Sequence, residues 1–126
     1  MQIDNLTPEL LGEVLGEEYN PRLVEWFQIE EDNYLRTYYD CGRYDSQGRP
    51  TGLGIEINIY ELQHKCKEWA TTKHYSVMSG WYMTHWGGTY AVEVKQGNKI
   101  LFSQSADSEP KAVFRACQWI LDNKEN

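Results

Sequence analysis

The spacing of apolar residues predicts a helix near the start of the chain. Thr7 can accept hydrogen bonds from free backbone N–H groups, and Pro8 suits the first helical position. Gly16 can end this helix in a left-handed conformation. The apolar face of the predicted helix consists of Leu10, Leu11, Val14 and Leu15.

Two further helices are predicted by the same spacing of three and four residues. One covers residues 59–72, where Asn58 can cap the first turn. The other begins after Asp107 or Ser108 and has Pro110 in its first turn. The apolar stripe of the earlier helix is Ile59, Leu62, Cys66 and Trp69, and that of the later helix is Val113, Ala116, Cys117, Ile120 and Leu121.

The segments between the first two helices favour extended structure. Alternating, tyrosine-rich residues predict a strand over residues 34–39. Residues 22–29 fit both a short helix and a strand, and we favour a strand from about Trp26. Residues 45–52 are rich in turn formers and are expected to form a long polar loop. Residues 55–57 are expected to add a short extended piece.

The segment before the last helix predicts three strands joined by tight turns. The first covers residues 75–86, and Gly87-Gly88 is a hairpin turn signal. Residues 89–94 return along it, because Tyr90, Val92 and Val94 share one face. A second turn at 96–98 leads into a strand over residues 99–103. The whole is a three-stranded meander.

Strands joined by hairpins form antiparallel sheets, so the expected class is α+β. We expect one antiparallel sheet, made of the meander 75–103 and the strand 34–39, packed by three helices in an α–β–α sandwich. The 126 residues suit a single domain over 1–126. Roughly two-thirds of the surface would be buried on folding, which is enough for a core without metal or disulfides.

Acidic residues gather in the first half of the chain. Residues 1–63 hold 13 Asp and Glu against 4 Arg, for a net charge of −9. Residues 64–126 hold 6 acids against 8 Lys and Arg, for a net charge of +2. This distribution, with −7 for the whole chain, argues against direct binding to nucleic acid, which requires clustered Lys and Arg.

Two interpretations of the acidic half stay open. Solvated acids keep a small protein soluble. Alternatively, an acidic surface can dock onto a basic groove of another protein, steered by long-range attraction. The candidate docking acids are Glu17, Glu18, Glu30, Glu31 and Asp32.

The cysteines and the apolar runs indicate a compartment. Three cysteines without a secretory signal favour reduced thiols in a cytoplasm. Cys66 and Cys117 fall on apolar helix faces and are expected to be small core residues. No apolar run approaches the roughly 20 residues of a membrane-spanning helix, so we expect no membrane contact.

The order of elements over residues 59–122 carries a family resemblance. A Trp-containing helix precedes a Trp-rich hairpin, a short strand, and then an acidic turn and an Ala-, Arg- and Cys-containing helix over residues 105–117. With the opening Leu6-Thr7-Pro8-Glu9-Leu10-Leu11, this order resembles the Phage ABA sandwich family of small phage and prophage proteins. The resemblance implies a phage origin, an α–β–α sandwich and a host-cell cytoplasm. It implies no catalytic residues.

Spacings for metal or cofactor chemistry are not found in the sequence. His64 and Cys66 are two residues apart on a helix and face different directions, while His74 and His85 stand alone. Gly52-Leu53-Gly54 is too short for a dinucleotide or phosphate loop. We therefore expect no metal and no cofactor.

Nucleophilic catalysis has one weak candidate. Cys41 and His85 could meet in the fold, since such partners come together in space rather than in sequence. No Asn or Asp is placed to orient the imidazole, so a bystander thiol is favoured.

The aromatic hairpin has two interpretations. Its residues Trp81, Tyr82, Trp86 and Tyr90 could form a stacking platform for sugars or bases. Aromatic residues in a meander are more often part of the core. If these residues are exposed, Trp81 and Trp86 are the candidate binding residues.

Together these observations predict a small acidic protein of phage type that acts without catalysis. It would bind a host protein that has a basic surface, as a monomer or small homo-oligomer, and could inhibit a nucleic-acid-binding defence enzyme in the manner of an anti-CRISPR protein. The alternative is a ligand-binding or hydrolase domain with an aromatic cleft around Trp81, His85 and Trp86.

Overall fold

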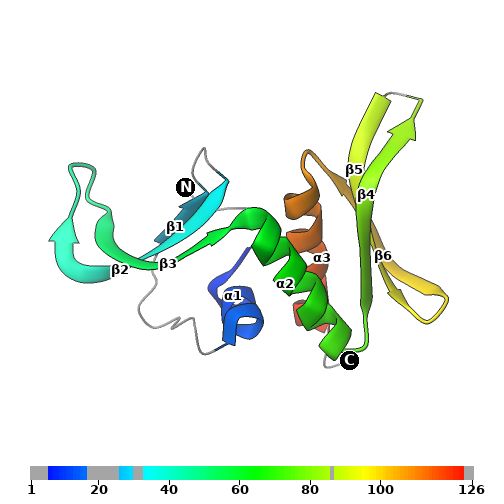
Figure 1. Ribbon diagram of the computed structural model, residues 1–126, viewed down its shortest axis with the longest axis horizontal. Helices are drawn as coiled ribbons and strands as arrows, with labels where there is room; N and C mark the ends of the chain where they lie inside the picture. Colours follow the sequence, from blue (N-terminus) through cyan, green and yellow to red (C-terminus); the bar gives the residue numbers. More distant parts are fainter. Residues whose placement is uncertain (1–5, 17–25, 30–32, 86, 124–126) are drawn as a thin grey trace. The chain divides into compact units, whose positions relative to one another are not determined.

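The chain forms two compact units, Met1–Leu62 and Gln63–Asn126. The computed structural model describes residues 6–16, 26–29, 33–85 and 87–123. Figure 1 shows the elements of both units. The prediction of one domain over the whole chain stays a prediction.

The first unit begins with helix α1 (Pro8–Leu15). The backbone N–H of Leu10 donates to the Thr7 hydroxyl at 3.2 Å, as the sequence predicts for a capping threonine. Gly16 has φ of 61° just past the helix, a conformation that favours glycine. Leu10 and Leu11 are fully buried, so the predicted apolar face of this helix is confirmed.

The first sheet consists of three antiparallel strands in the order β1-β2-β3. They are β1 (Trp26–Ile29), β2 (Tyr34–Tyr44) and β3 (Pro50–Asn58). The strand predicted from Trp26 is therefore confirmed. The loop predicted over 45–52 is wrong at its second end, because β3 already begins at Pro50. The turn is only residues 45–49, and polar contacts of its own residues close it.

The second unit contains a meander of β4 (Ser76–Thr84), β5 (Gly87–Gln96) and β6 (Lys99–Ala106), in the order β4-β5-β6. The second predicted turn is confirmed, since Gln96 pairs with Lys99 across Gly97 and Asn98. The first is displaced, because Thr84 pairs with Gly87 and Gly87 therefore belongs to β5.

Helix α3 (Glu109–Asn123) packs on one face of this second sheet, as Figure 1 shows. Val92 and Val94 on β5 are fully buried, as is Phe114 on the helix. The rings of Phe102 and Trp119 lie 5.5 Å apart between β6 and α3. This apolar layer is the core of the second unit, with roughly 25 cal/mol of stabilisation per Å² of apolar surface that it buries.

Helix α2 (Ile59–Thr72) has the bounds that its sequence pattern predicts. The Asn58 side chain accepts a hydrogen bond from the backbone N–H of Tyr60 at 2.9 Å. Within the second unit, the Cys117 thiol of α3 donates to the Cys66 carbonyl of α2 at 3.5 Å. Both cysteines are fully buried, which confirms that they are core residues.

The α+β class is confirmed, but the described strands form two sheets instead of one. The expected sheet placed the strand around Tyr34–Tyr39 beside the meander. In the structure, β2 has β1 along one edge and β3 along the other, so neither edge is left for a strand of the meander. No helix among the described residues is long and apolar enough to cross a membrane.

Candidate functional site

Most of the residues singled out by the sequence lie outside the described part of the chain. These are the five acids Glu17, Glu18, Glu30, Glu31 and Asp32, together with Trp86. Trp81 lies within it, on β4. The structure therefore shows the geometry of the aromatic hairpin at Trp81. For the acidic surface, only the net charge of the unit that contains it can be given.

The charge asymmetry of the sequence follows the boundary between the two units. Unit 1, residues 1–62, contains the same 13 acids and 4 Arg, for a net charge of −9. Unit 2, residues 63–126, contains 6 acids and 8 Lys and Arg, for +2. Negative charge is thus a property of one folded unit, and the other is nearly neutral.

Two of the four arginines of the first unit already hold a carboxylate. The Arg36 Nε donates to Glu56 Oε2 at 2.6 Å across β2 and β3. The Arg49 Nε donates to Asp45 Oδ2 at 2.8 Å. Setting these two pairs aside leaves 11 acids against two arginines in residues 1–62, which again gives −9. The net charge therefore resides on acids other than Asp45 and Glu56.

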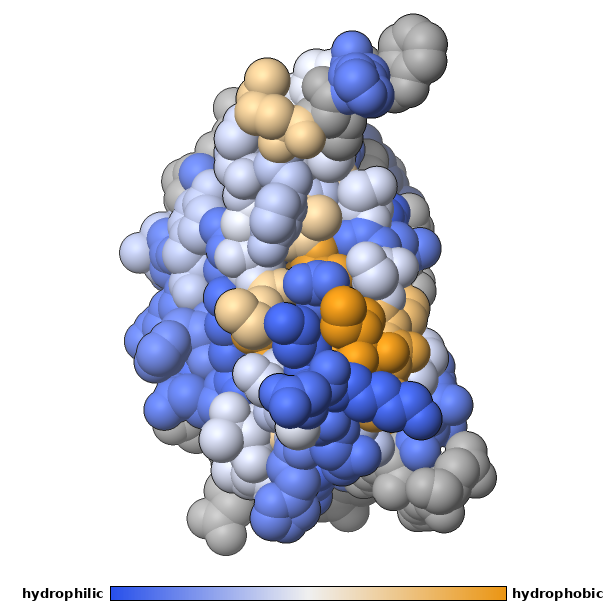
Figure 2. All heavy atoms as spheres, turned by 90° about the vertical axis from the view of Figure 1, so that its right-hand side faces the viewer, coloured by the Kyte–Doolittle hydropathy of each residue, from blue (hydrophilic) through white to orange (hydrophobic). Residues whose placement is uncertain are grey.

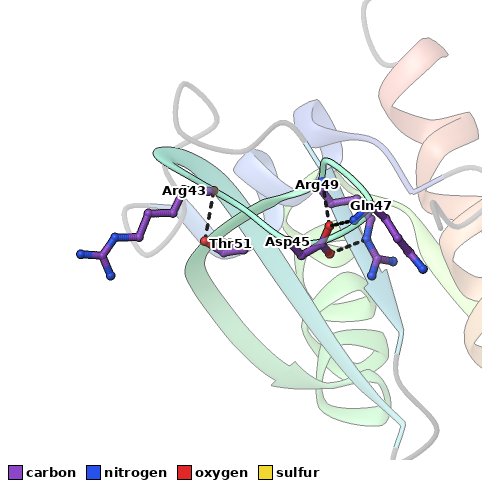
Figure 3. Close-up of polar contacts among 5 residues, drawn as sticks. All are labelled: Arg43, Asp45, Gln47, Arg49 and Thr51. Atoms are coloured by element: carbon purple, nitrogen blue, oxygen red, sulfur yellow. Dashed lines mark hydrogen bonds and ion pairs between the residues drawn. The ribbon is translucent and has the colours of Figure 1, made fainter.

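Figure 3 shows the turn that joins β2 to β3. The Asp45 carboxylate accepts hydrogen bonds from the backbone N–H groups of Gln47 and Arg49, at 2.8 and 3.0 Å. The Thr51 hydroxyl donates to the Arg43 carbonyl at 3.1 Å. The bond from the Arg49 N–H is the main cause that lowers the pKa of Asp45 below its usual 3.8, and the Arg49 guanidinium adds to it. The guanidinium of Arg43 points away from this turn in Figure 3.

The end of the β4–β5 hairpin exposes three consecutive large side chains. Trp81 is 56% exposed, Tyr82 45% and Met83 75%. Side chains alternate between the faces of a strand, so Trp81 and Met83 share one face and Tyr82 lies on the other. Trp81 is therefore not a core residue, and this answers the question that its sequence left open.

The position of α3 explains why Trp81 is exposed. Its face of β4 is the one that α3 covers, because the Ser79 hydroxyl donates to Glu109 Oε2 at 2.6 Å. Glu109 is the first residue of α3, so Trp81 lies two residues beyond the point where the helix begins. The Lys67 amine, 3.9 Å from the same Glu109 oxygen, adds an ion pair to this contact.

The exposed Trp81 ring is nevertheless held in place on one side. Its ring centroid lies 4.8 Å from that of Tyr90, at an interplanar angle of 71°. A Cβ atom at Gly88 would come within 1.8 Å of Trp81 Cζ2, so the indole occupies the space that any larger residue would need. Glycine at position 88 therefore permits this placement of the indole.

Sequence reasoning named Trp81, did not single out Met83, and interpreted Gly88 only as part of a turn. The structure instead pairs Gly88 with Met83 across β4 and β5, and a glycine inside a strand often marks a close approach. His85, a member of the predicted aromatic cleft, is exposed.

The described residues contain no group of three or more His, Cys, Asp or Glu side chains that could hold a metal ion. Cys41, the candidate nucleophile, is exposed on β2, where its sulfur lies 3.9 Å from the Thr51 hydroxyl. The side chain of Cys117 and burial raise the pKa of the Cys66 thiol well above 9.0, so this thiol stays protonated.

Comparison with protein-family models finds no matching family, and comparisons with curated proteins and with solved structures find no similar protein.

Proposed function

We propose that the chain is a non-catalytic binding protein that uses the β4–β5 hairpin as its anchor on a partner protein. The observation that carries the proposal is the exposed indole of Trp81, held against Tyr90 and over Gly88. Tryptophan is enriched among residues that dominate interface energies. A ring already fixed in place loses little conformational entropy when a partner binds.

The acidic first unit would guide the approach to that partner. Its net charge of −9 attracts a basic surface over a distance of about 8 Å at physiological salt. Steering of this kind acts mainly on the association rate, whereas the aromatic anchor acts on the dissociation rate. The two units thus have different roles in one binding event.

The partner of this proposal is a host protein with a basic, nucleic-acid-binding surface, such as a defence enzyme that a phage-type protein would inhibit. Clustered carboxylates present the charge that such a surface recognises in phosphates. The candidate contact acids remain Glu17, Glu18, Glu30, Glu31 and Asp32. The phage origin in this proposal is what the resemblance of residues 59–122 to the Phage ABA sandwich family implies.

The anchor is tested with immobilised protein in a bacterial lysate, followed by mass spectrometry of captured proteins. Trp81→Ala should reduce capture at least about tenfold, as expected for the loss of a hot-spot residue. Gly88→Ala should do the same without removing the indole, because the new methyl group displaces it. Tyr60→Ala is the matched control, since Tyr60 on α2 is 55% exposed.

The steering is tested by reversing the five candidate acids to lysine. Association should slow in the reversed protein, and raising salt from about 0.1 M to about 1 M should slow the parent protein more than the variant. Unchanged capture by Trp81→Ala and Gly88→Ala would contradict the proposal that Trp81 anchors the partner. An unchanged association rate after charge reversal would contradict the proposal that the acids steer its approach.

The exposed ring also favours a second candidate, the stacking of a sugar or a base on Trp81. This candidate predicts that soluble oligosaccharides or nucleotides quench the fluorescence of the parent protein and not of Trp81→Ala. Capture of a protein partner without such quenching would contradict it.

A further inference from the structure

The second sheet has an outer face that α3 does not cover. Val77, Val94 and Phe102 are paired across the three strands. Val77 and Val94 are buried, and Phe102 contacts Trp119 of α3. Because side chains alternate along each strand, the next row, Met78 and Glu93 with Ser103, points away from the helix.

This outer face exposes large apolar side chains around a charged centre. Met78 on β4 is 48% exposed and Ile100 on β6 is 50% exposed. The register between β5 and β6 shifts after Val94, so that Ile100 lies opposite Lys95 and not on the face of Phe102. Figure 2 shows this side of the second unit, where apolar residues are bordered by hydrophilic ones. Apolar surface with a polar rim marks interaction sites on soluble proteins.

The charged centre is a pair of opposite charges on the middle strand. Glu93 is paired with Met78 across the sheet, and Lys95 is paired with Ile100. The two charged residues lie two positions apart on β5, so both point outward. In the described part of the chain, neither forms an ion pair with a neighbouring residue.

We propose that a second copy of this chain packs face to face on the outer surface of β4-β5-β6. A two-fold axis at the level of Val94, across the strands, places Glu93 of each copy over Lys95 of the other. The same operation brings the two Met78 side chains together along one edge and the two Ile100 side chains along the other. The contact is thus self-complementary in charge and in apolar surface.

The charges of the two units favour a contact between second units, and the size of the face limits its strength. A contact between two second units brings together two net charges of only +2, so the repulsion is small. A contact between two first units would bring together two net charges of −9. Three strands of about eight residues cover about 370 Å² of flat sheet per copy, which gives an interface below the usual size of stable complexes. The dimer is therefore expected to be weak and dependent on concentration.

The test is sedimentation velocity of the full chain over a range of concentrations. The parent protein should shift from monomer to dimer as its concentration rises. Glu93→Lys and Lys95→Glu should each weaken the dimer at least about tenfold, because like charges then face each other. The double variant Glu93→Lys/Lys95→Glu should restore it, because the charges are exchanged.

Two further variants separate this face from the hairpin anchor. Ile100→Asp should abolish the dimer, whereas Met83→Asp, on the opposite face of β4, should leave it unchanged. A monomer at every concentration overturns the proposal, and so does a dimer that is insensitive to both single charge variants. Failure of the double variant to recover, with circular dichroism unchanged, also overturns it. None of these outcomes depends on the capture of a partner by Trp81.

Discussion

The two sheets of this protein have the same number of strands but are stabilised differently. In the first sheet, the register between β2 and β3 shifts twice, and ion pairs and turn hydrogen bonds join the strands. In the second sheet, β4 and β5 pair without a shift over nine positions, and β5 and β6 pair with one shift. A 15-residue helix covers one face of this sheet.

The difference lies in the polar contacts that fix how the strands of the first sheet pair. Thr37 lies inside the first unit at 1% exposure, and its hydroxyl accepts a hydrogen bond from the Ile55 N–H at 2.7 Å. A buried hydroxyl is costly unless it is paired, so this contact fixes the relation of β2 to β3. Apolar burial stabilises both units, through fully buried Leu35 on β2 in the first and Val92, Val94 and Phe114 in the second. The polar contacts of the first sheet add specificity to the pairing of its strands.

The largest expected effect is in the core of the second unit. Phe114→Ala should lower the free energy of unfolding by about 3–5 kcal/mol, because it removes a fully buried ring and leaves a cavity. Ile100→Ala, at a half-exposed position of the same unit, should cost less than about 1 kcal/mol. Urea titration followed by circular dichroism checks both. Equal losses would mean that α3 does not supply the core.

A matched pair of glycines compares the two sheets directly. A Cβ at Gly54 would lie 2.6 Å from the Thr37 hydroxyl oxygen and 3.3 Å from the Thr37 carbonyl. At Gly80, the nearest atom would be the Tyr82 ring carbon at 3.9 Å, an ordinary contact. Gly54→Ala should therefore destabilise the protein by about 1–3 kcal/mol.

Gly80→Ala should be neutral or stabilise the protein by up to about 1 kcal/mol, because alanine restricts the unfolded chain. Thermal unfolding of dilute protein checks both glycine variants. An equal loss of stability for Gly80→Ala and Gly54→Ala would contradict the inference that the approach of Thr37 requires a glycine at position 54.

The cysteines should report the same contrast through their reactivity. Cys41 on the first sheet is exposed, whereas Cys66 and Cys117 in the second unit are buried. Cys41 should react at once with a thiol reagent, and the other two only as fast as the second unit opens. Mass spectrometry of a time course checks this. Rapid labelling of all three would show that the second unit is not tightly packed.

Cys66 also gives a pH dependence. The side chain of Cys117 and burial raise its folded pKa above 9.0. Below pH 9 the thiol is protonated in both states and has no effect. Above pH 9 the unfolded state ionises first, so stability falls as pH rises. Cys66→Ala should flatten this alkaline decline, measured as unfolding midpoints against pH.

The smallest expected effect concerns the turn of the first sheet. The pKa of Asp45 is lowered, so its stabilisation is complete above its usual pKa of 3.8 and is lost as pH falls through the lower folded value. Asp45→Asn should remove this dependence and loosen the turn, since the amide gives up the charge-assisted bonds to Arg49. NMR shifts of the Gln47 and Arg49 amides check it. Unchanged shifts across this pH range in the parent protein would contradict it.

The sequence predicted local structure correctly where that structure depends on residues that are close together in the chain. The cap at Thr7, the bounds 59–72 of α2 and the strand at Trp26 each depend on neighbouring residues. The loop after Tyr44 was predicted too long, because composition does not show that Thr51 reaches back to the carbonyl of Arg43. The exposure of Trp81 could not be predicted, since it depends on where α3 begins relative to Ser79, 30 residues away.

By itself, the amino-acid sequence determined the helices, most of the strands and the separation of charge between residues 1–63 and 64–126. These follow from the spacing of side chains within a few positions and from a simple count. Only the tertiary structure decided that the strands divide into two sheets, because the pairing of β2 on both edges is a long-range choice. It also decided that Trp81 is a surface residue, since burial depends on what packs against a side chain and not on the side chain itself.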